Sequence, residues 1–405
     1  KFTRGALSDF PVLTSMRKTE FVNDFLKNSY APDISDNFCK LAAPIACGGA
    51  LLAAILSLIF NRSVEGAGGI FIAFSVFSGT LSLCSCFATI FAVNLPLLKG
   101  TSKYLESSSA MLSYQSVEDF GDTNSVLLDV SQLFPEGTVT LSSIKVFSGT
   151  QIDEAIVQAA SLTSHSGSIL KHMFYDIIVG KTEMLNPVES YIYEDSMGLC
   201  GWINNKRVLL GSRELMINHS IEGMPTAARE REYTENGRAA VYLSISGELS
   251  AMFIIDIKAN PEVDYCLKEF EKNEVSVMLR TVDSIISINK LSELFGVSPD
   301  MFKLLPFRLH NEFEETTSYV PKQSSSLVCN GRFASFASLI IGTKRIRKTA
   351  NIGLIIQAAS GILGLLMALV FAVLSSFPEL SPTVVLLYNL AWAGLTVLIQ
   401  TIRKA

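Results

Sequence analysis

Charged residues are scarce in this sequence: Asp, Glu, Lys and Arg make up 18% of its 405 residues, whereas 49% are hydrophobic. Average soluble domains carry more charge, about 25%. Together with the positive mean hydropathy, this composition predicts that part of the chain lies in a lipid bilayer. The basic residues form no long run and the formal net charge is -5, which argues against nucleic acid as a partner.

Cysteine is also scarce, with seven residues in the whole chain and no paired CxxC motif. The sequence therefore predicts neither a disulfide framework nor a zinc ribbon, and we expect most of the cysteines to be free thiols. A signal peptide is not expected either, because the start at Lys1 lacks the order of a charged, an apolar and a cleavage-site segment. We expect that a further N-terminal part precedes Lys1.

Four long apolar runs are present, each at or above the ~20 residues that a helix needs to cross the hydrocarbon core. They are Phe38 to Phe60, Ile70 to Leu98, Ile352 to Val373 and Thr383 to Ile402. Because lipid cannot hydrogen-bond to an open backbone, we predict four membrane-spanning helices arranged as two pairs. A very hydrophobic core helix is the alternative interpretation of any single run.

Basic residues lie on one side of these runs. Lys99 and Lys103 follow the second run, four basic residues precede the third, and two follow the fourth, whereas the linkers within the pairs contain only Arg62. By the positive-inside rule, this bias predicts a multi-pass protein of the cell (plasma) membrane with the central region and both termini in the cytoplasm.

The central region alternates strand-like and helix-like segments, as is typical of an α/β fold. Ser125 to Leu128, followed by Asp129, has the pattern of a buried strand that ends in a turn. Further strands are predicted at Val241 to Ile245, Ser250 to Ile255 and Val275 to Leu279, and amphipathic helices at Gln151 to Leu162 and Asp264 to Lys272. The strand-rich part from Ile144 to Ile254 is predicted to be an inserted domain.

Several short motifs occur in one order along the chain. They are Leu83-Cys84-Ser85-Cys86, Leu128-Asp129-Val130-Ser131-Gln132-Leu133, Ser166-Gly167-Ser168-Ile169-Leu170, Gly198-Leu199-Cys200-Gly201, Val208-Leu209-Leu210-Gly211 and Val277-Met278-Leu279-Arg280-Thr281-Val282-Asp283. This order resembles the heavy-metal branch of the P-type ATPases, which carries CPC, DKTGT, SEHPL, GxGVxG, VLVGN and VMLTGDN motifs in the same sequence. The resemblance covers nearly the whole chain.

The resemblance implies a membrane α-helical part with four spans and a cytoplasmic α/β HAD-like phosphorylation domain into which an α+β nucleotide-binding domain is inserted. We therefore divide the chain into a linker from a missing or lost actuator region (1–37), a transmembrane helix pair (38–98), a phosphorylation-type domain (99–143 and 255–345), a nucleotide-binding-type domain (144–254) and a second helix pair (346–405). The actuator domain of the family carries a TGE loop, and residues 1–37 contain none.

Asp129 matches the aspartate that this family phosphorylates with ATP and Mg²⁺. Such chemistry needs a nucleophile, a cation beside the transferred group and a carboxylate-held metal. Val130 stands where the family has Lys, Gln132 where it has Gly, and Arg280 where its TGDN motif begins with Thr. An aspartate that only begins a turn after a strand is the alternative interpretation.

The carboxylates that hold Mg²⁺ in the family are also missing. No aspartate occurs after Asp300, and the stretch that should contain the GDGxND motif offers only Glu312, Glu314 and Glu315. Because losing one preorganised group typically costs ~10²- to 10³-fold in rate, several losses together predict that ATP-driven turnover is impaired.

The nucleotide site implied by the resemblance is reduced as well. Ser168 stands where the family has the His of its His-Pro pair, and His165 could replace that imidazole or lie in solvent. Gly198, Gly201 and Gly211 remain. These glycines allow either close approach of a nucleotide or ordinary strand turns.

In the second apolar run, Cys84 and Cys86 could bind Cu(I), Zn(II) or Cd(II), or serve as small apolar residues. Ser85 replaces the family's proline, and on a regular helix the two sulfurs would diverge by about 200°. Asn389 falls where zinc-exporting members have a metal-binding pair, although hydrogen bonding between helices explains it equally well.

These features predict a P-type-ATPase-like membrane protein whose catalytic machinery is impaired, a pseudo-ATPase with a regulatory or scaffolding role. Its expected surroundings are the lipid bilayer, a metal ion and a partner membrane protein. Two alternatives remain open: an active ATP-driven metal cation transporter with divergent motifs, and an ATP-independent metal-binding membrane protein.

Overall fold

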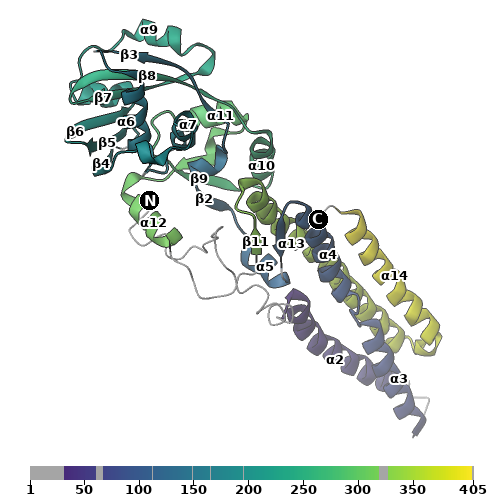
Figure 1. Ribbon diagram of the computed structural model, residues 1–405. Helices are drawn as coiled ribbons and strands as arrows, with labels where there is room; N and C mark the ends of the chain where they lie inside the picture. Colours follow the sequence, from purple (N-terminus) through teal and green to yellow (C-terminus); the bar gives the residue numbers. More distant parts are fainter. Residues whose placement is uncertain are drawn as a thin grey trace. The chain divides into compact units, whose positions relative to one another are not determined.

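The computed structural model describes residues 32–60, 67–111, 113–147, 149–164, 166–194, 196–318 and 327–403. Most of the predicted N-terminal linker (1–37), most of the external linker within the first helix pair and His165 lie outside these residues. The chain forms two compact units, one built mainly from residues 124–318 and the other from the segments before and after them. Figure 1 shows the elements of both units.

A parallel three-stranded sheet in the order β10-β9-β2 lies in the first unit. Its strands are β2 (Ser125–Asp129), β9 (Ser276–Arg280) and β10 (Phe302–Leu304), and the helices between and after them are α10 (Pro261–Lys272), α11 (Ile288–Phe295) and α12 (His310–Ser318). Val126, Val277 and Leu279 are buried, as expected for strands of a parallel sheet with both faces covered. The strands predicted around Ser125 and Val275 and the helix at Asp264 are confirmed.

A six-stranded antiparallel sheet in the order β3-β8-β7-β6-β5-β4 lies in the same unit. Its strands are β3 (Val139–Val146), β4 (Val188–Glu194), β5 (Gly198–Ile203), β6 (Lys206–Gly211), β7 (Ala239–Ile245) and β8 (Glu248–Ile257), accompanied by α6 (Ile152–Ser164), α7 (Leu170–Ile177), α8 (Arg213–Asn218) and α9 (Ala227–Tyr233). The strands predicted at Val241 and Ser250 and the helix at Gln151 are confirmed.

Helices cover both faces of this sheet. On the face of α7, the ring of Phe174 packs edge-on against Phe253 of β8, with 5.0 Å between centroids. On the other face, Leu215 of α8 joins a buried cluster with Tyr242 and Met252. Tyr242 is paired with Met252 in the sheet, and Phe253 is the next residue of β8. Because successive side chains of a strand point to opposite faces, Tyr242 packs under α8 and Phe253 under α7.

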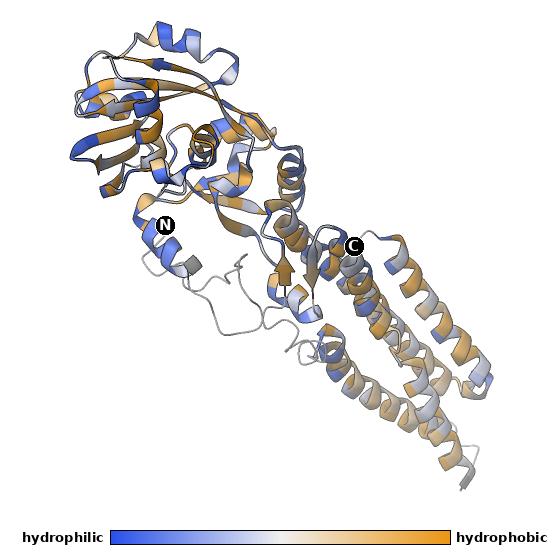
Figure 2. Ribbon diagram, viewed as in Figure 1, coloured by the Kyte–Doolittle hydropathy of each residue, from blue (hydrophilic) through white to orange (hydrophobic). Residues whose placement is uncertain are grey.

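The second unit consists mainly of long apolar helices. They are α2 (Ile34–Phe60), α3 (Ala67–Leu83), α4 (Thr89–Glu106), α13 (Phe333–Val373) and α14 (Pro382–Ile402), with α5 (Tyr114–Phe120) and the strand pair β1 (Ser109–Met111) and β11 (Leu327–Cys329). Three of them, α2, α13 and α14, are long and apolar enough to cross a membrane, and α3 is a shorter apolar helix. Figure 2 shows the hydrophobic colouring of these helices.

The prediction of one continuous second span from Ile70 to Leu98 is wrong. Helix α3 ends at Leu83 and α4 begins at Thr89, so the run is broken in its middle. Helix α13 is longer than the predicted third span, because it starts at Phe333 and continues through the basic residues that precede Ile352. Apolar residues such as Leu41 (69% exposed) and Phe71 (75% exposed) lie on the outer surfaces of the helices, as lipid-facing positions require.

Candidate functional site

The carboxyl ends of β2 and β9 place two charged residues side by side. β2 ends at Asp129, and β9, its parallel neighbour, ends at Arg280, with the two residues paired in the strand register. Side chains at paired positions of adjacent strands point to the same face of a sheet. This edge of an open α/β sheet is also where such folds usually bind ligands.

Arg280 holds the Asp129 carboxylate directly. Its Nε and Nη2 atoms lie 2.9 and 2.8 Å from the same carboxylate oxygen, Oδ2. The third guanidinium nitrogen, Nη1, donates to Oε1 of Glu314 on α12 at 2.6 Å. The side chains of Arg280 and Asp129 are only 10% and 19% exposed, so solvent screens this charge-assisted pair weakly.

The backbone at Gly167 covers the same pair. A Cβ atom at this glycine would lie 2.2 Å from Nη2 of Arg280 and 2.9 Å from Oδ2 of Asp129. The second oxygen of Asp129, Oδ1, accepts a hydrogen bond from the backbone N–H of Ser131 at 3.0 Å. Both carboxylate oxygens are therefore engaged, and a phosphoryl group on Oδ2 would have to displace Arg280 and the Gly167 backbone.

Asp283 connects the loop after β9 with the start of α7. The buried carboxylate accepts hydrogen bonds from the Ser168 hydroxyl and, at 2.9 Å, from the backbone N–H of Ile169. Burial raises the pKa of Asp283 to about 7, helped by the negative charge of Asp129 and opposed by the two hydrogen bonds. Ser168, predicted to contact a nucleotide, is thus committed to a contact within the protein.

The acidic residues around Asp129 do not fit Mg²⁺. This ion needs near-octahedral oxygen ligands, but Glu314 is bound to Arg280, and Asp283 to Ser168 and Ile169. In the part of the chain that the structure describes, no group of three or more His, Cys, Asp or Glu side chains is placed to hold a metal ion. Among the described residues, Asp129, Asp283 and Glu314 are therefore all engaged by other protein groups.

Two of the predicted nucleotide-binding glycines, Gly198 and Gly211, face each other across β5 and β6. Gly198 has a φ of +143°, and a Cβ atom there would lie 2.3 Å from the carbonyl oxygen of Leu210. The cavity that these glycines line together with Ser168 and Asp283 measures about 10 Å³. Such a volume holds about one water molecule and is far too small for an adenine ring.

The third glycine, Gly201, packs against apolar side chains. A Cβ atom there would lie 2.7 Å from Cγ1 of Val188 and 2.9 Å from Cδ1 of Leu162 on α6. The structure thus places all three glycines within β5 and β6, at positions where other protein atoms approach closely.

The break between α3 and α4 contains both candidate metal-binding cysteines. Cys84 is buried, and the thiol of Cys86 donates to the carbonyl oxygen of Gln357 on α13 at 3.3 Å. Gly361 of α13 permits this approach, since a Cβ atom there would lie 3.2 Å from Sγ of Cys86. The regular-helix geometry expected from the absence of a proline is therefore wrong, because contacts with α13 accommodate an opened helix.

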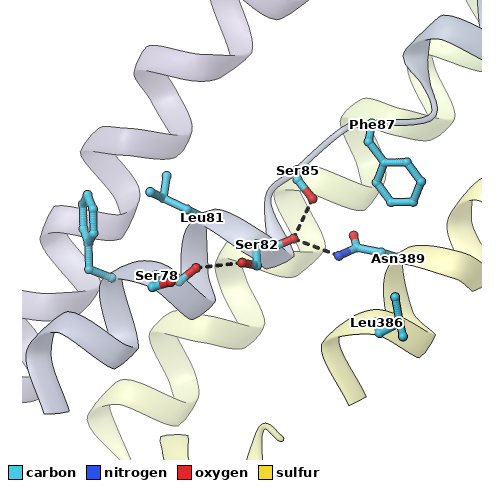
Figure 3. Close-up of a pocket in the computed structure, with 8 residues that line it drawn as sticks. Ser78, Leu81, Ser82, Ser85, Phe87, Leu386 and Asn389 are labelled. Carbon is cyan, nitrogen blue, oxygen red and sulfur yellow. Dashed lines mark hydrogen bonds between the residues drawn. The ribbon is translucent and has the colours of Figure 1, made fainter. Parts of the chain in front are cut away.

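Asn389 of α14 contacts the last turn of α3, which leads directly into this break. Its Nδ2 donates to the carbonyl oxygen of Ser82 at 2.9 Å, as Figure 3 shows. Asn389 is 8% exposed, and its Oδ1 has no hydrogen-bond partner among the described residues. It borders a groove of about 520 Å³ that is lined by Phe77, Ser78, Leu81, Ser82, Ser85, Phe87, Leu386 and Asn389.

Three contacts at the Asp129 edge were not predicted. Gly167 covers the ion pair, Glu314 binds the far side of Arg280, and the guanidinium lies over the Phe313 ring at 5.1 Å from its centroid. Gly167 and Glu314 both lie in segments that the motifs singled out, but for other roles. A signal was available in Arg280, a cation at the end of an otherwise apolar strand, which requires a nearby anion when buried.

Comparison with known protein sequences gives matches to copper-transporting ATPases. No family model matches the chain. Copper-exporting P-type ATPase B of Archaeoglobus fulgidus is 24% identical over 247 residues, which are 58% of this chain and 34% of that protein. Copper-transporting ATPase 1 of Rhizobium meliloti is 18% identical over 223 residues, which are 55% of this chain and 27% of that protein. The chain spans about a third of the length of these relatives.

Solved structures match more of the chain at lower identity. The match to a zinc-transporting PIB-type ATPase in its E2.Pi state covers 93% of this chain and 65% of the ATPase chain, with 12% identity and a TM-score of 0.49. The catalytic domain of the CPx-ATPase CopB-B matches 60% of this chain and 98% of its own, with 13% identity and a TM-score of 0.36. From the sequence matches and the ordered motifs, the chain is a relative of the heavy-metal branch of the P-type ATPases.

Proposed function

We propose that this chain is a pseudo-ATPase: a membrane protein of heavy-metal P-type ATPase descent that does not phosphorylate Asp129 and has a regulatory or scaffolding role. The observation that carries the proposal is the engagement of Asp129 Oδ2 by Arg280 beneath the Gly167 backbone. A nucleophile must present a free oxygen to the phosphorus atom along its line of attack. Here that oxygen already holds a cation.

Arg280 does not replace the cation that assists phosphoryl transfer. A catalytic cation must be oriented toward charge that develops on the transferred group. The guanidinium of Arg280 is instead held between two carboxylates of the protein itself, Asp129 and Glu314. Val130, directly after Asp129, supplies no substitute charge.

An autophosphorylation assay tests this proposal. Full-length protein in detergent is incubated with γ-labelled ATP and Mg²⁺, and acid-stable, hydroxylamine-labile label is compared with that of Asp129→Ala. We expect equal background in both. If the wild-type protein acquires label and Asp129→Ala does not, the proposal is wrong. That result would favour an active metal cation transporter with divergent motifs.

A second candidate function is ATP-independent metal binding in the membrane. It is favoured by the break at Cys84 and Cys86, which releases both thiols from regular helix geometry. Equilibrium binding of Cu(I), Zn(II) and Cd(II) is measured for the purified protein and for the Cys84→Ser/Cys86→Ser double variant. Cys47→Ser, at an exposed free thiol of α2, is the matched control. Equal affinity in all three proteins would exclude this function.

We further infer a multi-pass location in the plasma membrane with the α/β unit in the cytoplasm. Support comes from the basic residues Lys99 and Lys348, which lie in the halves of α4 and α13 that are nearest that unit in sequence. Reporter fusions after Arg403 and within the Leu374–Ser381 turn test the orientation. Cytoplasmic signals from both sites would contradict it.

A further inference from the structure

The six-stranded sheet and its helices, residues 138–257, form one part of the α/β unit, which we call the lid. We propose that an aromatic clasp of Tyr193, Phe307 and His310 holds the lid closed over Asp129, and that release of this clasp opens the unit. The clasp is a conformational device of the fold. It acts in the same way whether or not Asp129 is ever phosphorylated.

Two adjacent segments of the chain join the lid to the parallel sheet. The chain enters the lid through residues 135–138 and leaves it at Ile257 and Lys258. At this crossing Val139 pairs with Ile257, and the backbone N–H of Lys258 donates to the carbonyl oxygen of Thr138 at 2.9 Å. Hinges between domains consist of a few residues at the ends of elements, as here. Contacts away from this crossing therefore have to hold the lid closed.

The clasp joins a ring of the lid to two rings beside the parallel sheet. The ring of Tyr193, in β4, lies 4.9 Å from that of Phe307 and 5.7 Å from that of His310, which is nearly parallel to it at 20°. His310 begins α12, and its Nε2 lies 3.2 Å from the carbonyl oxygen of Leu305. Tyr193 and His310 are only 6% and 5% exposed. Closure thus combines the burial of these rings with their stacking.

The polar contacts between the lid and the parallel sheet favour closure less. Lys290 of α11 donates to the carbonyl oxygen of Gly237 at 2.6 Å, but this bond is exposed, so water competes for it. Asp283 accepts hydrogen bonds from Ser168 and Ile169 of the lid, but its carboxyl group is buried, and burial raises its pKa to about 7. Opening the lid would hydrate this group, which favours its ionised form. The clasp offsets this cost.

Closure of the lid determines access to Asp129. The backbone of the lid at Gly167 lies against Asp129 Oδ2, where a Cβ atom would be 2.9 Å from that oxygen. Between the lid and the loop around Asp283, the described residues leave a space of only about 10 Å³. Such a space holds about one water molecule. Release of the clasp would therefore turn a sealed edge of the parallel sheet into an open cleft.

Amide hydrogen exchange of the full-length protein in detergent, read by mass spectrometry, tests the proposal. The reporter is the backbone N–H of Ile169, which donates to Asp283 from the lid and exchanges when the lid opens. In Tyr193→Ala we expect the peptide that contains Ile169 to exchange roughly tenfold faster than in the wild-type protein. The peptide that contains β9 should keep its wild-type rate, which distinguishes opening of the lid from unfolding of the unit.

Further variants locate the effect. Phe307→Ala removes a ring from the other side of the clasp and should accelerate exchange at Ile169 in the same way, which keeps the test decisive if Tyr193→Ala fails to fold. Tyr193→Phe retains the ring and should exchange at the wild-type rate. Tyr265→Ala, at a tyrosine of α10 that is 63% exposed, is the matched control and should change nothing. Wild-type exchange at Ile169 in both clasp variants, or equal acceleration in β9, overturns the proposal.

Discussion

Arg280 and Asp129 are the last residues of two neighbouring parallel strands. Two nitrogens of Arg280, Nε and Nη2, lie 2.9 and 2.8 Å from one carboxylate oxygen of Asp129, Oδ2. The pair is mostly removed from solvent, and Glu314 completes the shell around the guanidinium. In an aspartate-phosphorylating enzyme, this carboxylate has to remain accessible to a triphosphate. Here it has the surroundings of a structural ion pair.

Arg280→Leu should destabilise the α/β unit, because it leaves the Asp129 carboxylate desolvated and without its counter-charge. We expect the free energy of unfolding to fall by roughly 2 to 4 kcal/mol, as measured by chemical denaturation of the solubilised protein. The Arg280→Leu/Asp129→Leu double variant should recover most of this loss, because it removes both charges. If the double variant is as unstable as Arg280→Leu, the loss of stability does not come from an unpaired Asp129 carboxylate.

Asp283 should make the unit less stable as pH rises. Its pKa is raised by burial to about 7 in the folded protein, so between the ordinary value of an aspartate and pH 7 the folded state binds a proton that the unfolded state has released. Stability from this group is therefore full at low pH and is lost as pH rises to about 7. Asp283→Asn keeps an acceptor for Ile169 but cannot ionise. We expect the variant's advantage in unfolding free energy to grow by about 2 kcal/mol from pH 5 to pH 8; an advantage independent of pH would contradict the assignment.

Gly198→Ala and Gly247→Ala separate steric clash from backbone strain. Both glycines have positive φ, +143° and +90°, but a Cβ atom at Gly198 would lie 2.3 Å from the Leu210 carbonyl oxygen, whereas at Gly247 it would meet no described atom within 4 Å. We expect Gly247→Ala to cost about 1 kcal/mol and Gly198→Ala to cost ~1 to 3 kcal/mol more. Denaturation midpoints check this order. Equal costs would mean that β5 and β6 can move apart at little expense.

Gly364→Ala should disturb the membrane helices. A Cβ atom there would lie 2.6 Å from the carbonyl oxygen of Leu83, the last residue of α3, whereas one at Gly394 would contact nothing within 4 Å in the described ranges. We expect Gly364→Ala to lower thermal stability in detergent, at a cost of about 1 to 3 kcal/mol, and Gly394→Ala to have no measurable effect. A similar melting temperature for both variants would show that α13 can shift away from α3.

The sequence predicted best what depends on local periodicity. The strand that ends at Asp129 and the helix at Gln151 were recognised because two-residue and 3.6-residue patterns are properties of the segments themselves. The extension of α13 before the apolar run was not predicted, for a related reason. Hydropathy falls at Lys344 to Lys348, but Lys and Arg are good helix formers, so the helix continues through them.

Contacts between distant segments could not be predicted. The position of Arg280 was noted, but its pairing with Asp129 depends on β9 lying between β2 and β10, and strand order is not a local property. The cover supplied by Gly167 depends further on how the segment before α7 returns over the parallel sheet. The broken second span was missed because part of what accommodates it lies on another helix, at Gly361 and Gly364 of α13.

The opened backbone after Leu83 survives without the proline that usually produces such a feature. Its conformation therefore depends in part on the neighbouring helix α13, whose glycines at positions 361 and 364 leave space for it. Changes within residues 84–88 would therefore act on only one side of this contact. Bulkier side chains at positions 361 and 364 would be the effective control, and any ligand that moved α13 would act on the two thiols at a distance.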